Sequence, residues 1–423
     1  MTKEIENKLI VFLFSAIPIS IIIGQAISLI NIFLISILII LIITLSKNYN
    51  FIYNQSIILL FALYLYLLLN TLISIDYSLS ISRNFGFIRL IFLFIAINYF
   101  FFYFKNQETV FKIWFLIISI VIIDSLIEYF TGKNILGFGH DNYADRIVSF
   151  FKDEPIVGGF INSFFLIILG FLFDRSNFKY KNYLFLFALF ILAAILSTGE
   201  RSNSIKSILA FIVFFMMVKN ITLANKIKSI SIVVVLIAIS IFSSEYLKYR
   251  FIDQPISTFF VKKMNSKDNQ INPYFQLQKS GYEVFKDNLL FGVGNKNYRY
   301  LTCDLNFKDT VDKQLNNERY ICSTHPHQTY LEFLSEHGLI GSLIILYIFY
   351  IIIFSKWRIF LKDFKYIQLG TFIYLIFAFS PLLPSGAFFS DYLLTIFTIN
   401  LSIFYASNSN LNIFLNNKKK NKL

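Results

Sequence analysis

Long apolar runs recur along almost the whole chain and restrict its fold more than any other feature of the sequence. Of the 423 residues, 56% are hydrophobic and only 15% are charged, and the mean hydropathy is +0.64. Soluble domains carry about 25% charged residues, so this composition excludes an ordinary soluble enzyme and a disordered chain. Because a membrane-spanning helix needs about 20 mostly apolar residues, the pattern predicts an all-α polytopic membrane protein.

The apolar runs predict about twelve transmembrane helices, nine within residues 1–242 and three within residues 338–406. Between these groups, residues 243–337 form one large hydrophilic loop, and residues 407–423 form a basic tail. The expected spans lie near Leu9–Gly24, Ile27–Leu45, Ile57–Ile73, Phe87–Phe104, Val110–Ile127, Val157–Phe173, Tyr183–Leu196, Ser204–Val218, Ile230–Phe242, Leu339–Phe354, Tyr366–Ser380 and Phe388–Tyr405.

The net charge of +13 is explained by membrane topology. An even number of spans places both termini on one side, and most lysines and arginines of the short loops fall on that side. Positive residues gather in the short cytoplasmic loops of membrane proteins. We therefore expect both termini in the cytoplasm and the large loop in the periplasm, with membrane lipids as partners. Nucleic-acid binding is not needed to explain the charge.

Several charged residues gather instead at the opposite, outer ends of the expected spans. They are Arg83, Arg89, Arg146, Arg201 and Asp391. Charges near hydrocarbon are costly and often functional, and the guanidinium group matches the oxygens of a phosphate. The pattern favours a site for an anionic ligand at the outward-facing surface of the membrane in which these spans lie. For Arg83 and Arg89 the alternative is that the side chains reach lipid headgroups.

The large loop contains a segment with helical spacing. Apolar and aromatic residues recur every three to four positions from Pro273 to Asn288, which predicts an amphipathic helix lying on the membrane or on the loop domain. Gly292–Asn295 follows as a tight turn, which on its own is weak support for any function.

The segment Cys322–Gly338 holds three of the four histidines of the chain. Thr324 can cap a helix, Pro326 suits its first turn and Gly338 suits its end. The sequence therefore predicts a helix between Thr324 and Gly338, with His327 in its first turn.

An imidazole at this position feels the positive end of the helix dipole, which favours its neutral, proton-accepting form. The free amides of the same turn attract phosphate. A metal is not expected, because the side chains of His325 and His327 would point apart on a helix and no Cys or carboxylate completes a four-ligand set.

Cys303 and Cys322 both lie in the large loop. In an oxidising compartment such a pair predicts a disulfide, which would tether the segment leading into His325. Two buried free thiols are the alternative.

The segment after His325 resembles the signature of the O-antigen ligase and polymerase superfamily: a His, then Asn, Ser or Gln, nine residues, a Gly, two residues and a small residue. Here it reads His327–Gln328, nine residues, Gly338, two residues, Gly341. The blocks at 288–294, 198–202 and 146–154 are also similar to the family's loop helix and glycine turn, its Arg-bearing turn and a further periplasmic block.

The resemblance implies a GT-C-like membrane glycosyltransferase in the bacterial inner membrane. Such an enzyme takes a glycan from undecaprenyl diphosphate and joins it to an acceptor at the periplasmic face, without a nucleotide sugar, a metal or another cofactor. An acceptor hydroxyl needs a base of near-neutral pKa, and a departing diphosphate needs fixed positive charge.

By position, the resemblance implies that His327 is the general base, with His325 able to share that role, and that Arg201 binds the diphosphate. Many relatives carry an Arg at the start of the loop helix, where this chain has Pro273–Phe275. A second diphosphate-binding residue then has to come from elsewhere, either Arg299 or Arg250, with Arg146 as a further candidate.

Three functions remain open at this point. The first is an O-antigen ligase that moves a glycan onto lipid A–core. The second is an O-antigen or exopolysaccharide polymerase, whose acceptor is another lipid-linked repeat unit. The third is a transporter of the lipid-linked glycan. The histidine motif in the outer loop and the outer-face arginines favour an enzyme, and they do not separate ligase from polymerase.

Overall fold

The computed structural model describes residues 3–139, 146–152, 154–176, 181–219, 221–257, 273–303 and 320–415. Within these ranges the secondary structure is helical apart from one isolated bridge between Lys133 and Gly139. Much of the predicted large loop, at 258–272 and 304–319, and most of the basic tail, at 416–423, lie outside the described residues.

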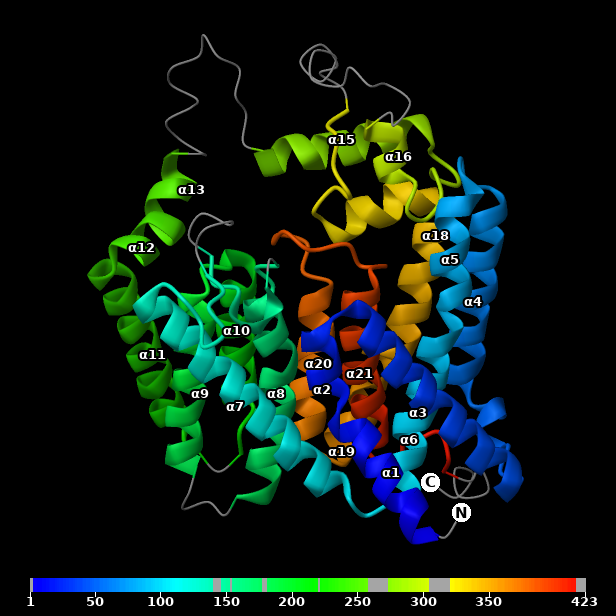
Figure 1. The fold of residues 1–423 in the computed structure, drawn as a ribbon, viewed down its shortest axis with the longest axis horizontal. Helices are drawn as coiled ribbons and strands as arrows, with labels where there is room; N and C mark the ends of the chain where they lie inside the picture. The colour runs from blue at the N-terminus through cyan, green and yellow to red at the C-terminus, as the bar shows by residue number, and fades with distance from the viewer. Residues whose placement is uncertain are drawn as a thin grey trace.

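The helices follow one another along the chain without intervening strands in the described part, and together they form a single bundle (Figure 1). In chain order they are α1 (Lys3–Ser15), α2 (Ile17–Ile23), α3 (Gln25–Ser46), α4 (Gln55–Leu72), α5 (Tyr77–Gly86), α6 (Ile88–Tyr103), α7 (Gln107–Thr131), α8 (Val157–Arg175), α9 (Lys181–Ser197), α10 (Arg201–Met216), α11 (Leu223–Ser243), α12 (Glu245–Lys248), α13 (Gln254–Ile256), α15 (Pro273–Asp287), α16 (Tyr298–Cys303), α18 (Thr329–Ile352), α19 (Trp357–Lys362), α20 (Tyr366–Ala378) and α21 (Asp391–Ala406).

The helices confirm an all-α membrane protein and leave the number of spans open. Eleven of the twelve apolar runs each fall on one helix, and the first falls on α1 and α2. By length and composition, seven described helices can cross a membrane, or eight if α1 and α2, bent by 46°, form one span. The apolar helices α9, α20 and α21 are shorter than the roughly 20 residues that a span normally needs. A count of twelve therefore remains a prediction.

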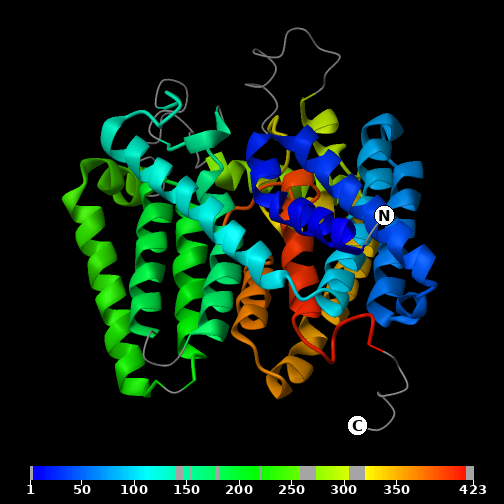
Figure 2. The same ribbon diagram turned by 60° about the horizontal axis from the view of Figure 1, so that its bottom comes forward.

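Helices α20 and α21 lie between two groups of helices. Figure 2 shows α8–α11 on one side of them and α4–α6 on the other. Helix α20 packs directly on α8, where Gly170 and Gly370 bring the two backbones into contact: a Cβ on Gly170 would lie 2.5 Å from the Cα of Ile367. Small residues commonly allow this close packing between membrane helices.

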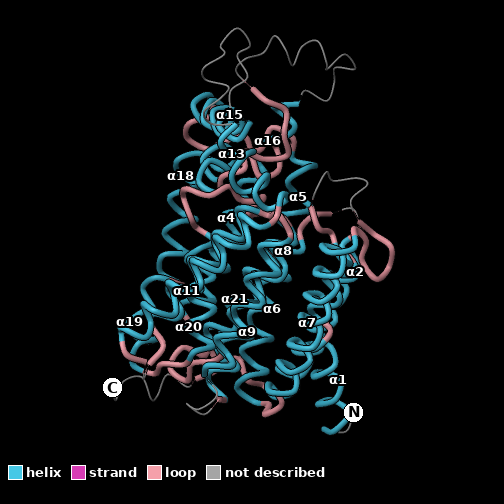
Figure 3. The backbone as a smooth tube through the Cα atoms, turned by 90° about the vertical axis from the view of Figure 1, so that its left-hand side faces the viewer, coloured by secondary structure: helices cyan, strands magenta, loops and turns pink. Residues whose placement is uncertain are grey.

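One end of the bundle carries the elements that the sequence analysis singled out. Helices α15 and α16, the start of α18 and the start of α10 lie toward this end, whereas α1 begins and α21 ends at the other (Figures 1 and 3). The amphipathic helix expected from Pro273 to Asn288 is confirmed as α15. It crosses the end of the bundle, while the long helices run roughly along it.

The helix expected between Thr324 and Gly338 is placed differently in the structure. Helix α18 begins at Thr329, and Gln328 caps it by accepting a 2.7 Å hydrogen bond from the Leu331 backbone amide. Both the Thr324 cap and the end at Gly338 were wrong, and His327 precedes the helix. At Gly338 (φ 63°) the helix only kinks, because another segment of the chain replaces the hydrogen bonds that the kink breaks.

That segment follows α15 and leads into the glycine turn. The amides of Leu339 and Ile340 donate to the carbonyls of Leu289 and Leu290 at 2.8 and 3.1 Å. The approach is so close that a Cβ on Gly292 would lie 2.5 Å from the Gly338 nitrogen. The glycine turn and the histidine motif therefore form one packed unit.

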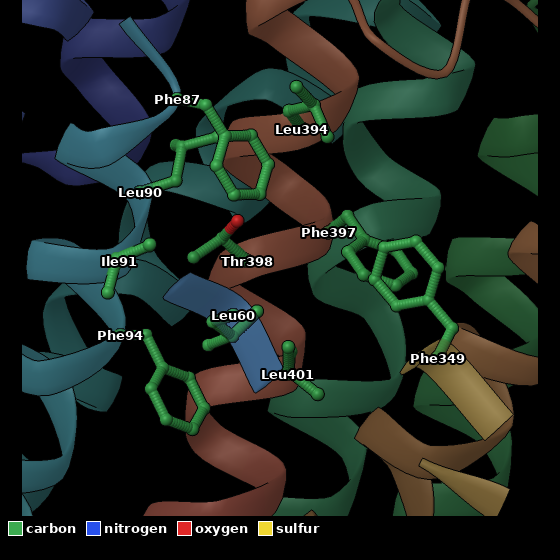
Figure 4. Close-up of a pocket in the computed structure, with 10 residues that line it drawn as sticks. All are labelled: Leu60, Phe87, Leu90, Ile91, Phe94, Phe349, Leu394, Phe397, Thr398 and Leu401. Carbon is green, nitrogen blue, oxygen red and sulfur yellow. The ribbon is translucent and has the colours of Figure 1, made fainter. Parts of the chain in front are cut away.

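A small apolar pocket lies inside the bundle between α4, α6, α18 and α21 (Figure 4). Thr398 is its only polar lining side chain, so the pocket lacks the several polar groups that recognition of a sugar or a phosphate needs. The lining residues are Leu60, Phe87, Leu90, Ile91, Phe94, Phe349, Leu394, Phe397, Thr398 and Leu401.

Candidate active site

The two histidines of the motif face each other in the segment that precedes α18. The ring centroids of His325 and His327 are 4.0 Å apart, and His327 has a left-handed backbone (φ 53°). The backbone amide of Ser385 donates to the carbonyl of His327 at 3.0 Å, and the hydroxyl of Thr329 donates to that of Ser385 at 3.0 Å. The loop between α20 and α21 thus fixes this unusual conformation.

His325 has no ring nitrogen left to accept a proton. Its Nε2 lies 3.2 Å from the carbonyl oxygen of Ser385, and its Nδ1 lies 2.8 Å from the hydroxyl of Thr324. Since a carbonyl only accepts, Nε2 carries the hydrogen and Nδ1 accepts from Thr324. Burial, and then the electrostatic influence of the neighbouring His327 ring, lower the pKa of His325 to about 3. The geometry suits a positioning role.

His327 keeps a free proton-accepting nitrogen. Burial lowers its pKa, a hydrogen bond to the Ser385 backbone raises it, and the positive charge of Arg146 lowers it again. The net shift is downward, so the ring is neutral at pH 7. A neutral imidazole that donates through one nitrogen accepts through the other. The ring of Tyr274, at the start of α15, meets His327 edge-on with centroids 5.9 Å apart.

Arg201 lies at the first position of α10, directly after a tight turn. Gly199 adopts φ 72° in this turn, where a Cβ would collide with the hydroxyl of Tyr246. The neighbouring Glu200 is buried and accepts from the backbone amides of Gly158 at 2.6 Å and Gly159 at 3.1 Å. Burial raises the pKa of Glu200 to about 7. This carboxylate fixes the Arg201 turn to the start of α8.

Arg250 is brought to the same turn from a π-helical turn after α12 (Tyr249–Asp253). Only 5% of the residue is exposed. Its Nη2 donates to the carbonyl of Gly199 at 3.1 Å and its Nη1 to Gln254 at 2.8 Å, while its buried Nε has no hydrogen-bond partner among the described residues. Burial and then the charges of Arg146 and Arg201 lower its pKa. Arg250 therefore lies close enough to Arg146 and to Arg201 to be repelled by both.

Arg146 belongs to a loop held by two buried carboxylates of α7. Glu128 accepts from the amides of Val148 at 3.0 Å and Ser149 at 2.6 Å, and Asp124 accepts from the Ser149 hydroxyl at 2.5 Å. The amide of Ile147 donates to the Thr198 carbonyl at 3.4 Å, which attaches the loop to the Arg201 turn. We call Arg146, Arg201 and Arg250 the arginine cluster.

The loop between α20 and α21 joins the arginine cluster to the histidines. The hydroxyl of Ser202, next to Arg201, donates to the Pro384 carbonyl at 2.5 Å. The following residue, Ser385, holds both histidines. Buried Glu332 of α18 fixes the far end of the loop by accepting from the amides of Phe388 at 2.8 Å and Phe389 at 3.3 Å. One short loop thus sets the position of a base relative to a group of cations.

Other candidates lie outside this arrangement. Arg299 is exposed on α16. Arg83 and Arg89 both form ion pairs with Asp391, which also accepts from Gln25, so in this structure they satisfy a buried carboxylate. We call Arg83, Arg89 and Asp391 the ion-paired group. Of the three residues proposed beside Arg201 for the diphosphate, Arg250 and Arg146 lie in the cluster and Arg299 lies outside it.

The residues that hold the site in place could not be predicted from local sequence patterns, with one exception. Ser385 lies about sixty positions from His325, and no local pattern relates the two. Glu332 could have been found, because a carboxylate near the start of a long apolar helix costs free energy unless it has a defined partner.

The disulfide expected in the loop is present: Cys303 and Cys322 are joined with an S–S distance of 2.09 Å. It attaches the segment that enters His325 to the end of α16. In the described part of the chain, no three His, Cys, Asp or Glu side chains are grouped so that they could hold a metal ion.

The family model described as O-antigen ligase matches residues 185–346. This region runs from α9 into α18 and contains Arg201, Arg250, His325 and His327, whereas Arg146 precedes it. No curated protein matches the sequence.

Proposed function

We propose, for a chain that belongs to the O-antigen ligase and polymerase superfamily, that it transfers a glycan from undecaprenyl diphosphate to lipid A–core. In this reaction an acceptor hydroxyl attacks the anomeric carbon of the donor. A new glycosidic bond forms, the bond from that carbon to the diphosphate breaks, and undecaprenyl diphosphate leaves. The hydroxyl proton goes to a base, and the negative charge that develops on the leaving diphosphate requires positive charge close by.

His327 is the base in this proposal. It is neutral at pH 7, it has one ring nitrogen free to accept a proton, and the loop around Ser385 orients it. His325 serves as a positioning residue, because both of its ring nitrogens are already hydrogen-bonded.

The arginine cluster binds the diphosphate. Guanidinium groups form paired hydrogen bonds with phosphate oxygens, and a group of cations that includes the buried Arg250 is stabilised by an anion that offsets their repulsion. The observation that carries the proposal is this cluster: the charges of Arg146 and Arg201 lower the pKa of Arg250, and the charge of Arg146 reaches His327.

A lipopolysaccharide gel of a deletion strain, read together with its lipid-linked glycan pool, tests the proposal. The ligase is supported by bare lipid A–core with accumulated long lipid-linked polymer. Core bearing a single repeat unit, with no ladder above it, would assign the polymerase reaction instead. An unchanged ladder would overturn both O-antigen reactions.

Complementation separates catalysis from transport. His327→Ala should insert normally and fail to restore the ladder. The matched control is Leu382→Ala, which changes an 89% exposed side chain in the loop that holds the histidines. Restoration of the ladder by His327→Ala would contradict an enzymatic role for this residue and favour a transporter.

A further inference from the structure

Helix α15 has three distinct faces. Ser280, Gly281 and Val284 form a buried face against the rest of the protein. Lysines and acidic residues form a second, charged face. The third face is apolar and exposed: Phe275 is 57% exposed and Tyr282 is 52% exposed. Phe285 follows at helical spacing and contacts the Tyr282 ring, with centroids 6.4 Å apart.

The apolar face continues without a break into the segment that follows α15. Leu289, Leu290 and Phe291 are 51%, 52% and 51% exposed. A row of three half-exposed large apolar residues next to an exposed aromatic face is unusual for a surface in water, where large apolar patches commonly mark an interaction site.

The same surface is continuous with helices that can span a membrane. The carbonyls of Leu289 and Leu290 accept from the amides of Leu339 and Ile340, which are themselves 42% and 40% exposed on α18. One turn further along this helix, Leu343 is 59% exposed. Because α18 is a candidate span, these exposed apolar side chains are suited to face lipid.

The neighbouring helix α4 shows the same continuity. At its end, Leu72 is 79% exposed, and in the turn that follows, Ile75 is 50% exposed. The amide of Ile75 donates to the carbonyl of Val293 at 3.0 Å, next to the glycine turn. Two candidate spans therefore extend their exposed apolar surface up to the level of the segment after α15.

We propose that the apolar face of α15, formed by Phe275, Tyr282, Phe285 and Leu289, lies in the surface of the lipid bilayer. The charged face then points toward water, and the buried face points toward the protein. An amphipathic helix in the interface has this division, and Tyr is enriched at that depth. This inference stands independently of the proposed reaction.

The arrangement connects the bilayer to the candidate active site. The buried face of α15 touches the histidine segment so closely that a Cβ on Gly281 would lie 2.6 Å from the Cβ of Pro326. At the start of the helix, Tyr274 contacts His327. Lipid that holds one face of α15 therefore holds the opposite face over the histidines.

Site-directed spin labelling of the full chain in phospholipid nanodiscs tests the proposal. Single substitutions Phe275→Cys, Tyr282→Cys and Leu289→Cys report on the apolar face, and Lys279→Cys and Glu283→Cys report on the charged face. The native cysteines form a disulfide and do not react with the label. Leu343→Cys, on a candidate span, provides the lipid-exposed reference.

The labels on the apolar face should be more accessible to oxygen than to a water-soluble nickel complex, as at position 343, and the labels on the charged face should show the reverse. Greater nickel accessibility at all three apolar positions would show a face in water. Low accessibility to both reagents would show a face covered by protein. Either result overturns the proposal. Three separate positions keep the test informative if one variant does not fold.

Discussion

Two groups of arginines lie toward the same end of this protein, and they differ in their counter-charges. Arg83 and Arg89 share the carboxylate of Asp391, and the three side chains are only 12–19% exposed. In the described part of the chain, no carboxylate lies within ion-pair distance of the arginine cluster formed by Arg146, Arg201 and Arg250. A cation paired inside the fold has its electrostatic need met there, whereas a group of cations without an ion pair is suited to bind an anion from outside.

The comparison teaches which arginines to regard as functional. All of them lie near the end of the bundle that the sequence predicts to face outward, so sequence position does not separate the two groups. The partner does. The predictions that follow treat the ion-paired group as structural and the arginine cluster as the anion site.

The largest effect is expected on stability, from breaking the ion-paired group. Asp391→Asn leaves two mostly buried guanidinium groups without a counter-charge, which should lower the free energy of unfolding by about 3–5 kcal/mol. Thermal unfolding in detergent measures this change. The rate per folded molecule should stay near wild type. A loss of rate with unchanged stability would assign the ion-paired group to the reaction.

The triple variant Arg83→Met, Arg89→Met, Asp391→Leu is the control for this experiment. It removes all three charges together and should recover most of the stability lost by Asp391→Asn, because replacing a complete buried ion pair with apolar residues is often neutral.

The next largest effect is expected on the rate, from the arginine cluster. Arg201→Gln should lower kcat/KM about 10²–10³-fold, the usual cost of removing one donor that stabilises developing charge. Its stability should hold, because no described carboxylate depends on it. The matched control is Arg299→Gln on α16, whose rate should stay near wild type. A larger loss of rate in Arg299→Gln than in Arg201→Gln would contradict this assignment and place the diphosphate site near α16.

A smaller effect is expected on the pH dependence of the rate. His327 must be neutral to accept a proton, and its pKa is below the ordinary 6.5, so the wild-type rate should fall only below pH 6.5. Arg146→Gln removes a charge that lowers this pKa. The acid limb of the kcat profile should therefore move to higher pH, by less than about one unit. An acid limb that moves to lower pH or does not move would show that the charge of Arg146 does not act on His327.

The smallest effect is expected next to the ion-paired group. Ser390 caps α21 by accepting from the Leu393 amide at 3.2 Å. Ser390→Ala should lower the free energy of unfolding by about 1 kcal/mol and leave the rate unchanged, as measured by thermal unfolding and glycan transfer. A selective loss of rate would extend the active site to this end of α21.

The sequence predicted the features that local pattern encodes. The amphipathic helix α15 and the pairing of Cys303 with Cys322 follow from spacing and compartment, and the motif at His327 follows from a short signature. Gly338 was misread, because a glycine after apolar periodicity usually ends a helix, and here hydrogen bonds from a segment about fifty residues earlier carry the helix past the kink.

The remaining contacts of the candidate site depend on long-range packing, which the sequence does not show. Arg250 reaches Gly199 across about fifty residues and Ser385 reaches His325 across about sixty, and a single sequence contains no periodicity that relates them. The shared partner of Arg83 and Arg89 could not be predicted from the sequence either, because Asp391 lies about three hundred positions away.

Binding of undecaprenyl diphosphate, measured by native mass spectrometry of the purified full chain, tests the central claim most directly. The His327→Ala background prevents turnover and should bind the probe like wild type. Adding Arg201→Gln to this background should weaken binding at least about tenfold, the equivalent of roughly 1.4 kcal/mol, whereas adding the triple replacement of the ion-paired group should not. Equal affinity with and without Arg201→Gln, or loss of binding only in the triple variant, would contradict the account.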